Sequence, residues 1–354
     1  MNTPRAIIEV AGVDVRWHDL VDIRFENTLY LAADSFEATF RNDNYLSDWF
    51  RKLQEVKIYL GYVKNPASWS KSELDHVFTG RIDGVKPKFG NSMTVQIIGR
   101  DYSAPMIDTE YSVAYAERTS SQIAAMLAQK YGLTPWITKT TVIVEKELQA
   151  DKKEWEVLQA LADREGFVCY VTKNKELYFG PRQEEDEEVV AELSYHVPGL
   201  ANIGEIEFDD STIGVINKVT IRHWGRNRQL IEASAVNQQV VDAMGGQIKE
   251  RVIYESRAKT YELAKMYAEK RLKQLSRTVV TASGICPGNP KIIAEKRVKV
   301  SGCGRFDEIY YVEKAVHKLS KSEGYRTSFD ITSVRPETAE QYRQDLYDYK
   351  EKTM

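Results

Sequence analysis

The stretch from Gly80 to Asp101, GRIDGVKPKFGNSMTVQIIGRD, is rich enough in glycine to raise the question of a phosphate-binding loop. Such a loop needs the order G-x-x-x-x-G-K-[ST] and a helix that opens directly after it. The glycines at 80, 84, 90 and 99 lack this order, and no helical pattern follows them. Apolar residues instead alternate with others from Met93 to Ile98, after turn residues at 87–92. The stretch therefore predicts a β-hairpin that belongs to the scaffold.

The histidines and cysteines give no metal-binding pattern. None of the five histidines forms H-E-x-x-H or stands at metal-ligand spacing from a cysteine, and each is predicted as a surface or strand residue. The three cysteines are too few for a disulfide framework, which fits a reducing compartment and buried free thiols. Cys169 lies in the apolar run FVCYV, which raises a thiol pKa and opposes nucleophilicity. The histidines are His18, His76, His196, His223 and His317, and the other cysteines are Cys286 and Cys303.

Other catalytic sets are also missing from the sequence. The segment TASGICPG lacks the leading glycine of a serine nucleophile elbow. Acid pairs for glycoside hydrolysis stay open, because 52 acidic residues offer many combinations and the requirement is spatial. The adjacent Asp209 and Asp210 would point to opposite faces of a strand. We therefore expect no enzyme activity, no cofactor and no bound metal.

Composition narrows the class of protein. A chain of 354 residues suggests two or three domains, and its formal net charge of -3 argues against nucleic-acid binding. The N-terminus has neither a signal peptide nor an apolar run long enough to span a membrane, so we expect synthesis in a bacterial cytoplasm and no membrane anchor. The 20 tyrosines against 11 phenylalanines favour a protein that binds partners.

Residues 1–110 read as a β domain. Short runs rich in β-branched and aromatic residues are separated by Asn, Asp, Gly and Ser, and one short helix, YLSDWFRKL, interrupts them. Six such strands predict a small barrel or sandwich.

Residues 111–199 read as two helices followed by a hairpin. In TSSQIAAMLAQKYGL, Thr119 is the predicted N-cap with Gln122 three residues later, and Gly132 follows the helix. In DKKEWEVLQALADREGF the predicted cap is Asp151 and the stop is Gly166. The run FVCYVTKNKELYFG then predicts a hairpin.

The rest of the chain returns to strands. We assign 200–235 together with 280–335 to a second β-barrel domain, and 236–279 to an inserted segment with a long amphipathic helix. The five acids at 184–188 predict a solvated loop. Residues 336–354 form a polar tail, which is either a loose end or a docking arm.

The last third repeats a pattern seen earlier. AEKRVKVSGCG and the following IYYVEKAVHKLSKSEGYRTSFDITSV have the order of LQEVKIYLGY and VFTGRIDGVKPKFGNSMTVQIIGR. In this alignment the segment that begins at Arg326 stands where the segment from Met93 stands, so Thr327 matches Thr94. The match is in pattern and not in identity, and it predicts two versions of one β domain.

The succession of these segments resembles the baseplate hub proteins of contractile phage tails, of the late control D type, with relatives in tail-like bacteriocins and other contractile injection systems. The resemblance runs from about residue 6 to 334. Its main segments are SFEATFRND, VKIYLGY, FTGRIDGVKP, VQIIGRDYSAPMID, TSSQIAAMLAQKYGL, WEVLQALADREGFVCYVTKNKELYFG, INKVTIRHWG and TYELAKMYAEKRLKQL.

This resemblance implies an α+β, mainly β fold with two tail-tube-like barrels in each chain, so that a homotrimer forms a pseudo-sixfold ring. It implies a structural role between a hexameric tail tube protein and a trimeric spike protein, with other baseplate proteins and the tape-measure protein as further partners. It transfers no catalytic residues. The protein would be incorporated into the tail or baseplate of a virion or tail-like particle.

Interface residues are predicted in three ranges: 34–44, 80–88 and 314–324. Two other functions stay open: a cell-wall or glycan hydrolase, which needs a cleft with paired carboxylates, and a carbohydrate-binding protein, which needs exposed coplanar aromatic residues. Candidates for the latter are Trp17, Trp69 and Trp224. The predicted interface residues are Asp34, Phe36, Arg41, Asn42, Asn44, Arg81, Asp83, Lys86, Lys314, His317 and Lys321.

Overall fold

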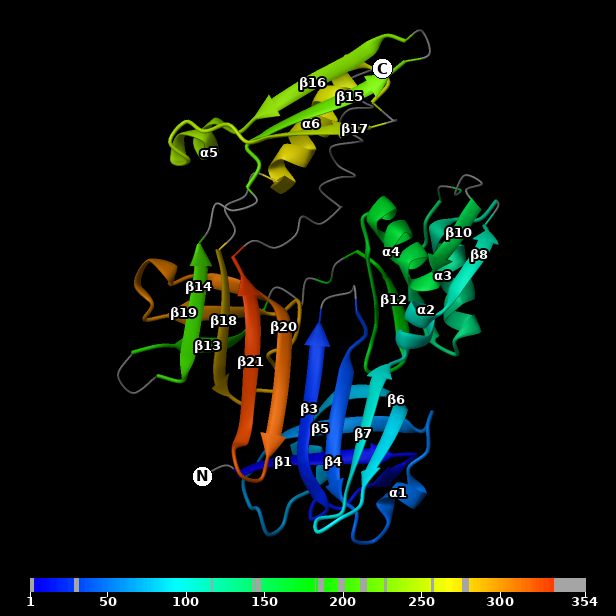
Figure 1. Cartoon of the computed structure of the whole chain (residues 1–354), viewed down its shortest axis with the longest axis vertical. Coiled ribbons are helices and arrows are strands. Elements are labelled where there is room, and N and C mark those ends of the chain that lie inside the picture. Colours follow the sequence, from blue (N-terminus) through cyan, green and yellow to red (C-terminus); the bar gives the residue numbers. More distant parts are fainter. Residues whose placement is uncertain are drawn as a thin grey trace. The chain divides into compact units, whose positions relative to one another are not determined.

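The computed structural model describes the chain in ranges separated by short gaps (Figure 1). Its described part divides into two units, one of residues up to Ile206 with Ser283–Ile331, the other centred on Glu207–Ala282. Strands dominate both units, so the predicted α+β, mainly β fold class is confirmed. The polar tail and most of the acidic run at 184–188 lie outside the described residues. The described ranges are 3–28, 32–115, 117–141, 143, 148–181, 183, 188–196, 201–210, 215–225, 228–255, 258–275 and 280–333.

The N-terminal β region forms what we call the first series of strands. Its spatial order is β3-β4-β7-β6-β5-β1, and each neighbouring pair is antiparallel. Alternate side chains of these strands, such as Phe25, Phe36 and Ile97, are buried in one core. The strands are β1 (Thr3–Val10), β3 (Leu20–Thr28), β4 (Ser35–Arg41), β5 (Glu55–Val63), β6 (Asp75–Lys88) and β7 (Thr94–Asp101), with the two-residue β2 (Val13–Asp14) paired to β1.

The glycine-rich stretch is part of this scaffold. Strands β6 and β7 pair from Gly80 opposite Asp101 to Lys88 opposite Thr94, which confirms the predicted hairpin. The predicted helix nearby is shorter than expected: α1 covers only Leu46–Trp49 and ends at Phe50, which has extended backbone angles. Phe50 is buried against Phe40, so its packing into the core ends the helix.

The C-terminal β region forms a second series of strands. Its spatial order is β14-β18-β21-β20-β19-β13. Taken in chain order, the strands of the two series correspond as β1 with β13, β3 with β14, β4 with β18, β5 with β19, β6 with β20 and β7 with β21. Corresponding strands then occupy the same place in the spatial order of their series. One pair differs in direction, since β13 and β19 are parallel whereas β1 and β5 are antiparallel. The strands are β13 (Val189–Ser194), β14 (Glu205–Asp210), β18 (Val280–Pro287), β19 (Arg297–Ser301), β20 (Ile309–Ser320) and β21 (Gly324–Thr332), with a 3-10 turn, η3 (Gly304–Phe306), before β20.

One strand pair joins the two series. The second half of β20 is antiparallel to β3, from Lys314 opposite Thr28 to Ser320 opposite Asp22. The two series therefore share one continuous sheet, which Figure 1 shows as adjacent orange and blue arrows. The range 314–324, predicted as an interface with another protein, is largely used for this joint inside the chain.

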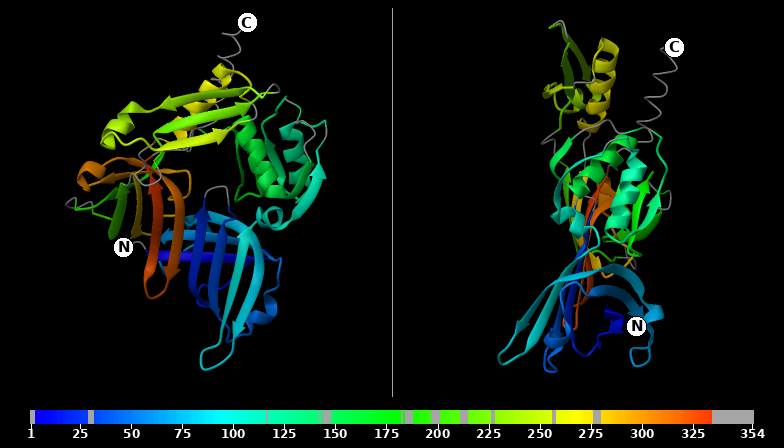
Figure 2. Two further views of the ribbon diagram at one scale, coloured as in Figure 1. Left: turned by 45° about the horizontal axis from the view of Figure 1, so that its top comes forward. Right: turned by 90° about the vertical axis from the view of Figure 1, so that its right-hand side faces the viewer.

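Along the chain, a module of helices and short strands separates the two series. Helices α3 (Ser120–Lys130) and α4 (Glu154–Glu165) pack with the sheet β11-β12-β9 around one apolar core (Figure 2). Strands β11 and β12 form the predicted hairpin, and Gly166 ends α4 with a φ of 85°. The predicted cap Asp151 is wrong: it lies in β10, and α4 begins after Lys153. Other elements of the module are α2 (Ala104–Asp108), β8 (Glu110–Ala114), β9 (Thr134–Ile137), β10 (Leu148–Lys153), β11 (Val168–Val171) and β12 (Glu176–Gly180).

The predicted cap of α3 is confirmed. The Thr119 hydroxyl accepts from the Gln122 backbone N–H, and the Gln122 side chain accepts from the Thr119 backbone N–H at 3.0 Å. We expect Thr119→Ala to lower the free energy of unfolding by about 1 kcal/mol, because one backbone donor at the helix start loses its partner. Chemical denaturation checks this. Thr119→Ser keeps the hydroxyl and serves as the control; an equal loss in both variants would contradict a capping role.

The second unit contains a separate three-stranded sheet, β16-β15-β17, with α6 on one face. The sequence placed β15 and β16 in the second barrel, but here they pair with each other and with β17. Along α6, Ala264, Ala268 and Leu272 are buried, whereas Tyr261 is exposed. None of the described helices is long and apolar enough to cross a membrane. The elements are β15 (Lys218–Trp224), β16 (Leu230–Val236), α5 (Gln238–Ala243), β17 (Glu250–Tyr254) and α6 (Tyr261–Leu275).

Candidate interaction surface

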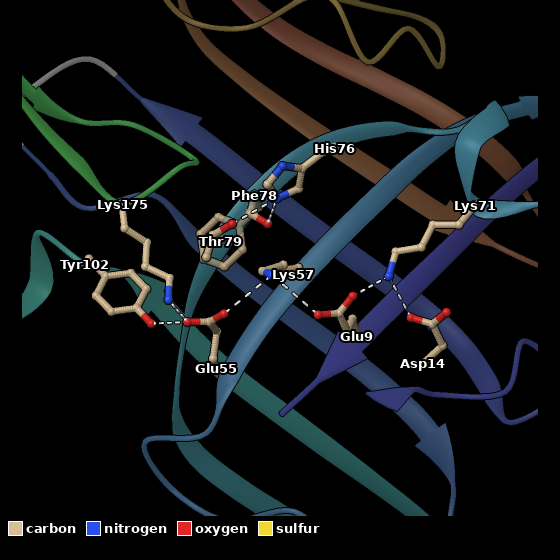
Figure 3. Close-up of polar contacts among 10 residues, drawn as sticks. All are labelled: Glu9, Asp14, Glu55, Lys57, Lys71, His76, Phe78, Thr79, Tyr102 and Lys175. Carbon is tan, nitrogen blue, oxygen red and sulfur yellow. Dashed lines mark hydrogen bonds and ion pairs between the residues drawn. The ribbon is translucent and has the colours of Figure 1, made fainter. Parts of the chain in front are cut away.

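A ladder of alternating charges covers the outer face of β1 and β5 (Figure 3). Lys71, from the 3-10 turn η1 (Lys71–Glu73), binds Asp14 at 2.8 Å between Nζ and Oδ1 and also binds Glu9. Lys57 Nζ lies 3.5 Å from Glu9 and 3.7 Å from Glu55. The ladder exists because Val56 of β5 points into the core, so its neighbours Glu55 and Lys57 point outward.

The ladder continues into the helix and hairpin module. Lys175, in the turn between β11 and β12, forms an ion pair with Glu55, which also accepts a hydrogen bond from Tyr102 at 2.6 Å. From the same turn, Lys173 donates to the backbone carbonyl of His76 at 2.8 Å. These contacts hold the module's turn against the first series.

Electrostatics in the ladder favour the charged forms. The hydrogen bond from Lys71 is the main reason that the pKa of Glu9 is lowered. Burial opposes ionisation of Glu55, but the hydrogen bonds from Lys175 and Tyr102 outweigh it and lower its pKa. Because each acid faces a lysine, the ladder attracts no charged ligand and acts as a brace between two parts of the chain.

We expect Lys175→Met to loosen this brace. The pair is partly exposed, so the loss of stability should be below about 1 kcal/mol, but amide exchange should rise in the β11–β12 turn. Hydrogen exchange with mass spectrometry measures the exchange of the amides in this turn. Lys265→Met, at an exposed lysine of α6, is the matched control. Unchanged protection in the turn would show that the ladder does not hold it.

Three of the predicted interface residues point into the core. Phe36, Asn42 and His317 each have at most 1% of their surface exposed, so their side chains offer nothing to a partner. Asn42 accepts from the Ser47 backbone N–H at 2.9 Å and braces the turn before α1. The interface prediction for these three fails because each occupies an inward position of its strand or turn.

The other predicted interface residues retain exposed or half-buried side chains. Arg41 and Lys321, from different predicted ranges, both line a hollow of about 430 Å³ beside the joint between β3 and β20. Lys321 also donates to the His18 carbonyl at 2.9 Å, and burial lowers its pKa. The remaining members of this group are Asp34, Asn44, Arg81, Asp83, Lys86 and Lys314.

Four of these are engaged in contacts inside the chain, among them Arg81, whose guanidinium carbon lies 4.5 Å from the centre of the Tyr102 ring. Burial, with the neighbouring Asp101 carboxylate as the second cause, raises the pKa of Asp34 to about 8. Asp83 pairs with Arg100 at 2.7 Å. Lys314 pairs with Glu26 at 2.7 Å, across the joint between the two series. Lys86 is exposed on β6.

The candidates for chemistry do not converge. Among the described residues, no three His, Cys, Asp or Glu side chains gather as metal ligands would. Cys169 is fully buried and burial raises its pKa, while Cys286 is buried with a pKa raised to about 12. Trp17 and Trp69 are half-buried, and the Arg5 guanidinium carbon lies 5.1 Å and 5.9 Å from the centres of their rings. These two rings therefore contact a cation, whereas the third candidate, Trp224, is 57% exposed.

The charged ladder was missed from the sequence. Its only signal is the alternation of Glu55 and Lys57 around buried Val56, which any half-buried strand shows. The partners Lys71 and Lys175 come from distant segments, and their spacing in the chain gives no hint of contact.

Three solved structures share this fold at low sequence identity. The tail protein from Neisseria meningitidis MC58 has a TM-score of 0.72 and 14% identity, over 94% of this chain and 97% of its own. The 43 kDa tail protein of prophage MuSo2 from Shewanella oneidensis has a TM-score of 0.71 and 15% identity, over 94% and 99%. The prophage tail protein gp18 from Listeria monocytogenes EGD-e has a TM-score of 0.61 and 13% identity, over 97% and 98%.

Similarity at the level of sequence is limited. No curated protein matches the chain. Residues 46–321 match the family model of the Alg8 N-terminal domain. This match spans more than half of the sequence, and the chain belongs to the Alg8 N-terminal domain family.

Proposed function

We propose that this protein is a structural baseplate hub of a contractile tail or tail-like injection particle. The observation that supports this most is the use of one strand order twice in a single chain. A threefold assembly can meet a sixfold tube only if each chain presents two similar modules. The two series of strands supply such modules.

The fold comparisons support the same proposal. The three similar structures are tail proteins, and the likeness extends over more than nine tenths of this chain and of theirs. As a homotrimer, this chain would place six similar modules in a ring, with the hexameric tail tube on one side and a trimeric spike on the other. Further baseplate proteins and the tape-measure protein would contact the same particle.

The proposed mechanism is mechanical and not catalytic. The ring would nucleate tube assembly and hold the spike until contraction drives tube and spike into the target envelope. Binding would use strand edges and broad side-chain surfaces, as obligate assemblies do. The protein would then be found in the tail particle after its synthesis in the bacterial cytoplasm.

Nucleation of the tube tests this function directly. The purified chain is added in substoichiometric amounts to the tail tube protein of the same particle, and polymerisation is followed by light scattering and negative-stain electron microscopy. We expect a shorter lag and tubes that carry the spike at one end when spike protein is present. An unchanged lag together with no binding to the spike would contradict the hub function.

A further inference from the structure

The joint between the two series shows how one module of this chain binds another. Beyond its pairing with β19, β20 leaves that strand and pairs through 314–320 with β3. One pair of opposite charges meets there, because Lys314 forms an ion pair with Glu26, whereas Lys318 stands opposite Arg24 and pairs with Glu323 of its own hairpin. The joint therefore combines backbone pairing with an ion pair between a lysine of β20 and an acid of β3.

The strand that corresponds to β20 in the first series is β6, and its second half has a free edge. Pairing of β6 with β5 ends at Arg81 opposite Glu55, and Ile82 adds two backbone hydrogen bonds, one with Leu53 and one with Gln54. From Gly84 to Lys88, β6 pairs only with β7 among the described residues. Both strands are irregular near their middle. In β6 the pairing with β7 shifts register between Ile82 and Gly84. In β20 the alternation of buried side chains is interrupted between Val312 and Ala315.

The charge of this free half matches that of β20. Lys86 and Lys88 are exposed and flank Pro87. Lysine and proline on an open edge discourage pairing with neutral strands. A partner strand that carries acids would convert the same lysines into attractive contacts.

The strand that corresponds to β3 in the second series is β14, with the sequence EIEFDD. It stands at one end of the strand order, so its second edge has no strand beside it among the described residues. Glu205, Glu207 and Asp209 are exposed and alternate with half-buried Ile206 and Phe208. The acids of β14 therefore have the opposite charge to the lysines on the free half of β6.

We infer that the free half of β6 in one copy pairs antiparallel with β14 of the next copy, repeating the joint between β20 and β3. This contact is head-to-tail, because β6 and β14 are different surfaces, and such contacts build closed rings when the rotation closes. The inference rests on the proposed function for the number of copies in the ring. It adds the strands and the charges through which the copies recognise one another.

Charge reversal tests the pairing. We expect K86E/K88E and E205K/E207K each to break the assembly to monomers, because like charges then face each other along the edge. The variant with all four changes restores opposite charges between the four reversed positions, and we expect it to assemble again. K64E/K139E reverses two exposed lysines outside β6 and β14 and is the matched control. Light scattering gives the mass, and circular dichroism confirms that each variant is folded.

Cross-linking identifies the contact independently. Copies labelled with ¹⁵N and unlabelled copies are mixed, assembled with the spike and treated with a zero-length carbodiimide. We expect mixed-label peptides that join Lys86 or Lys88 to Glu205 or Glu207.

The outcomes separate this inference from the proposed function. Charge-reversed variants that keep the mass of the wild type and still shorten the lag of tube assembly would overturn the pairing and leave the hub function standing. If the wild type assembles but its cross-links join other residues, and if it does not nucleate tubes, both the pairing and the hub function are contradicted. Loss of mass in both double variants, with recovery in the fourfold variant, supports the pairing whatever the result with the tube.

Discussion

Gly99→Ala is expected to be one of the most damaging glycine substitutions in the first series, with a loss of about 3 kcal/mol in the free energy of unfolding. A Cβ atom at this position would lie 2.0 Å from the Arg81 carbonyl oxygen and 2.6 Å from the Phe36 ring. The backbone of β6 cannot retreat without breaking its pairing with β7. Urea denaturation measures the loss, with circular dichroism to detect a chain that fails to fold.

A graded series provides the control for this prediction. At Gly84 an added Cβ would meet only the end of the Ile98 side chain at 3.1 Å, and at Gly61 of β5 the nearest atom is 3.4 Å away. We expect Gly84→Ala to cost less than Gly99→Ala, and Gly61→Ala to cost least. Equal losses at all three positions would mean that intrinsic strand propensity, and not close approach, sets the effect.

Acidification is expected to destabilise the protein through His317. This side chain is fully buried, with Nε2 at 3.0 Å from the Ile292 carbonyl and Nδ1 at 2.9 Å from the Tyr325 hydroxyl. Burial lowers its pKa to about 4, whereas the unfolded chain has the ordinary value of 6.5. The unfolded state thus takes up the proton first, and stability that is complete above pH 6.5 is lost as the pH falls towards 4. The loss amounts to about 3 kcal/mol.

The variant His317→Gln isolates this contribution. Its neutral amide can donate to Ile292 and accept from Tyr325 but takes up no proton in this range. We expect the wild type to lose more stability than the variant between pH 6.5 and pH 4, measured by urea denaturation across the range. Parallel curves for the two proteins would contradict the assignment to His317.

Local patterns predicted most of the strands because most of their side chains alternate between core and solvent. The hairpin of β6 and β7 and the caps at Thr119 and Gly166 follow from signals within a few residues. The grouping of strands into sheets was less predictable: β15 and β16 have the same texture as barrel strands, and only their pairing with β17 separates them.

The repeat was recognised in the sequence, but its register was one residue out of phase. The alignment placed Thr327 on Thr94, yet Thr327 is fully buried whereas Thr94 is half-buried beside inward Val95. Hydroxyl side chains fit either face of a strand, so they do not fix the phase. His317 and Phe36 were assigned to an interface as members of a range, although both occupy inward positions of their strands. The free edges of β6 and β14 could not be predicted, because they depend on which strands lack neighbours.

Mass in solution tests the central claim most directly. Light scattering is recorded across a concentration series, for the protein alone and with its neighbouring spike protein. The account predicts a stable species near three times 40.6 kDa, alone or only with the spike. A monomer under both conditions would contradict the hub and the ring on which it depends.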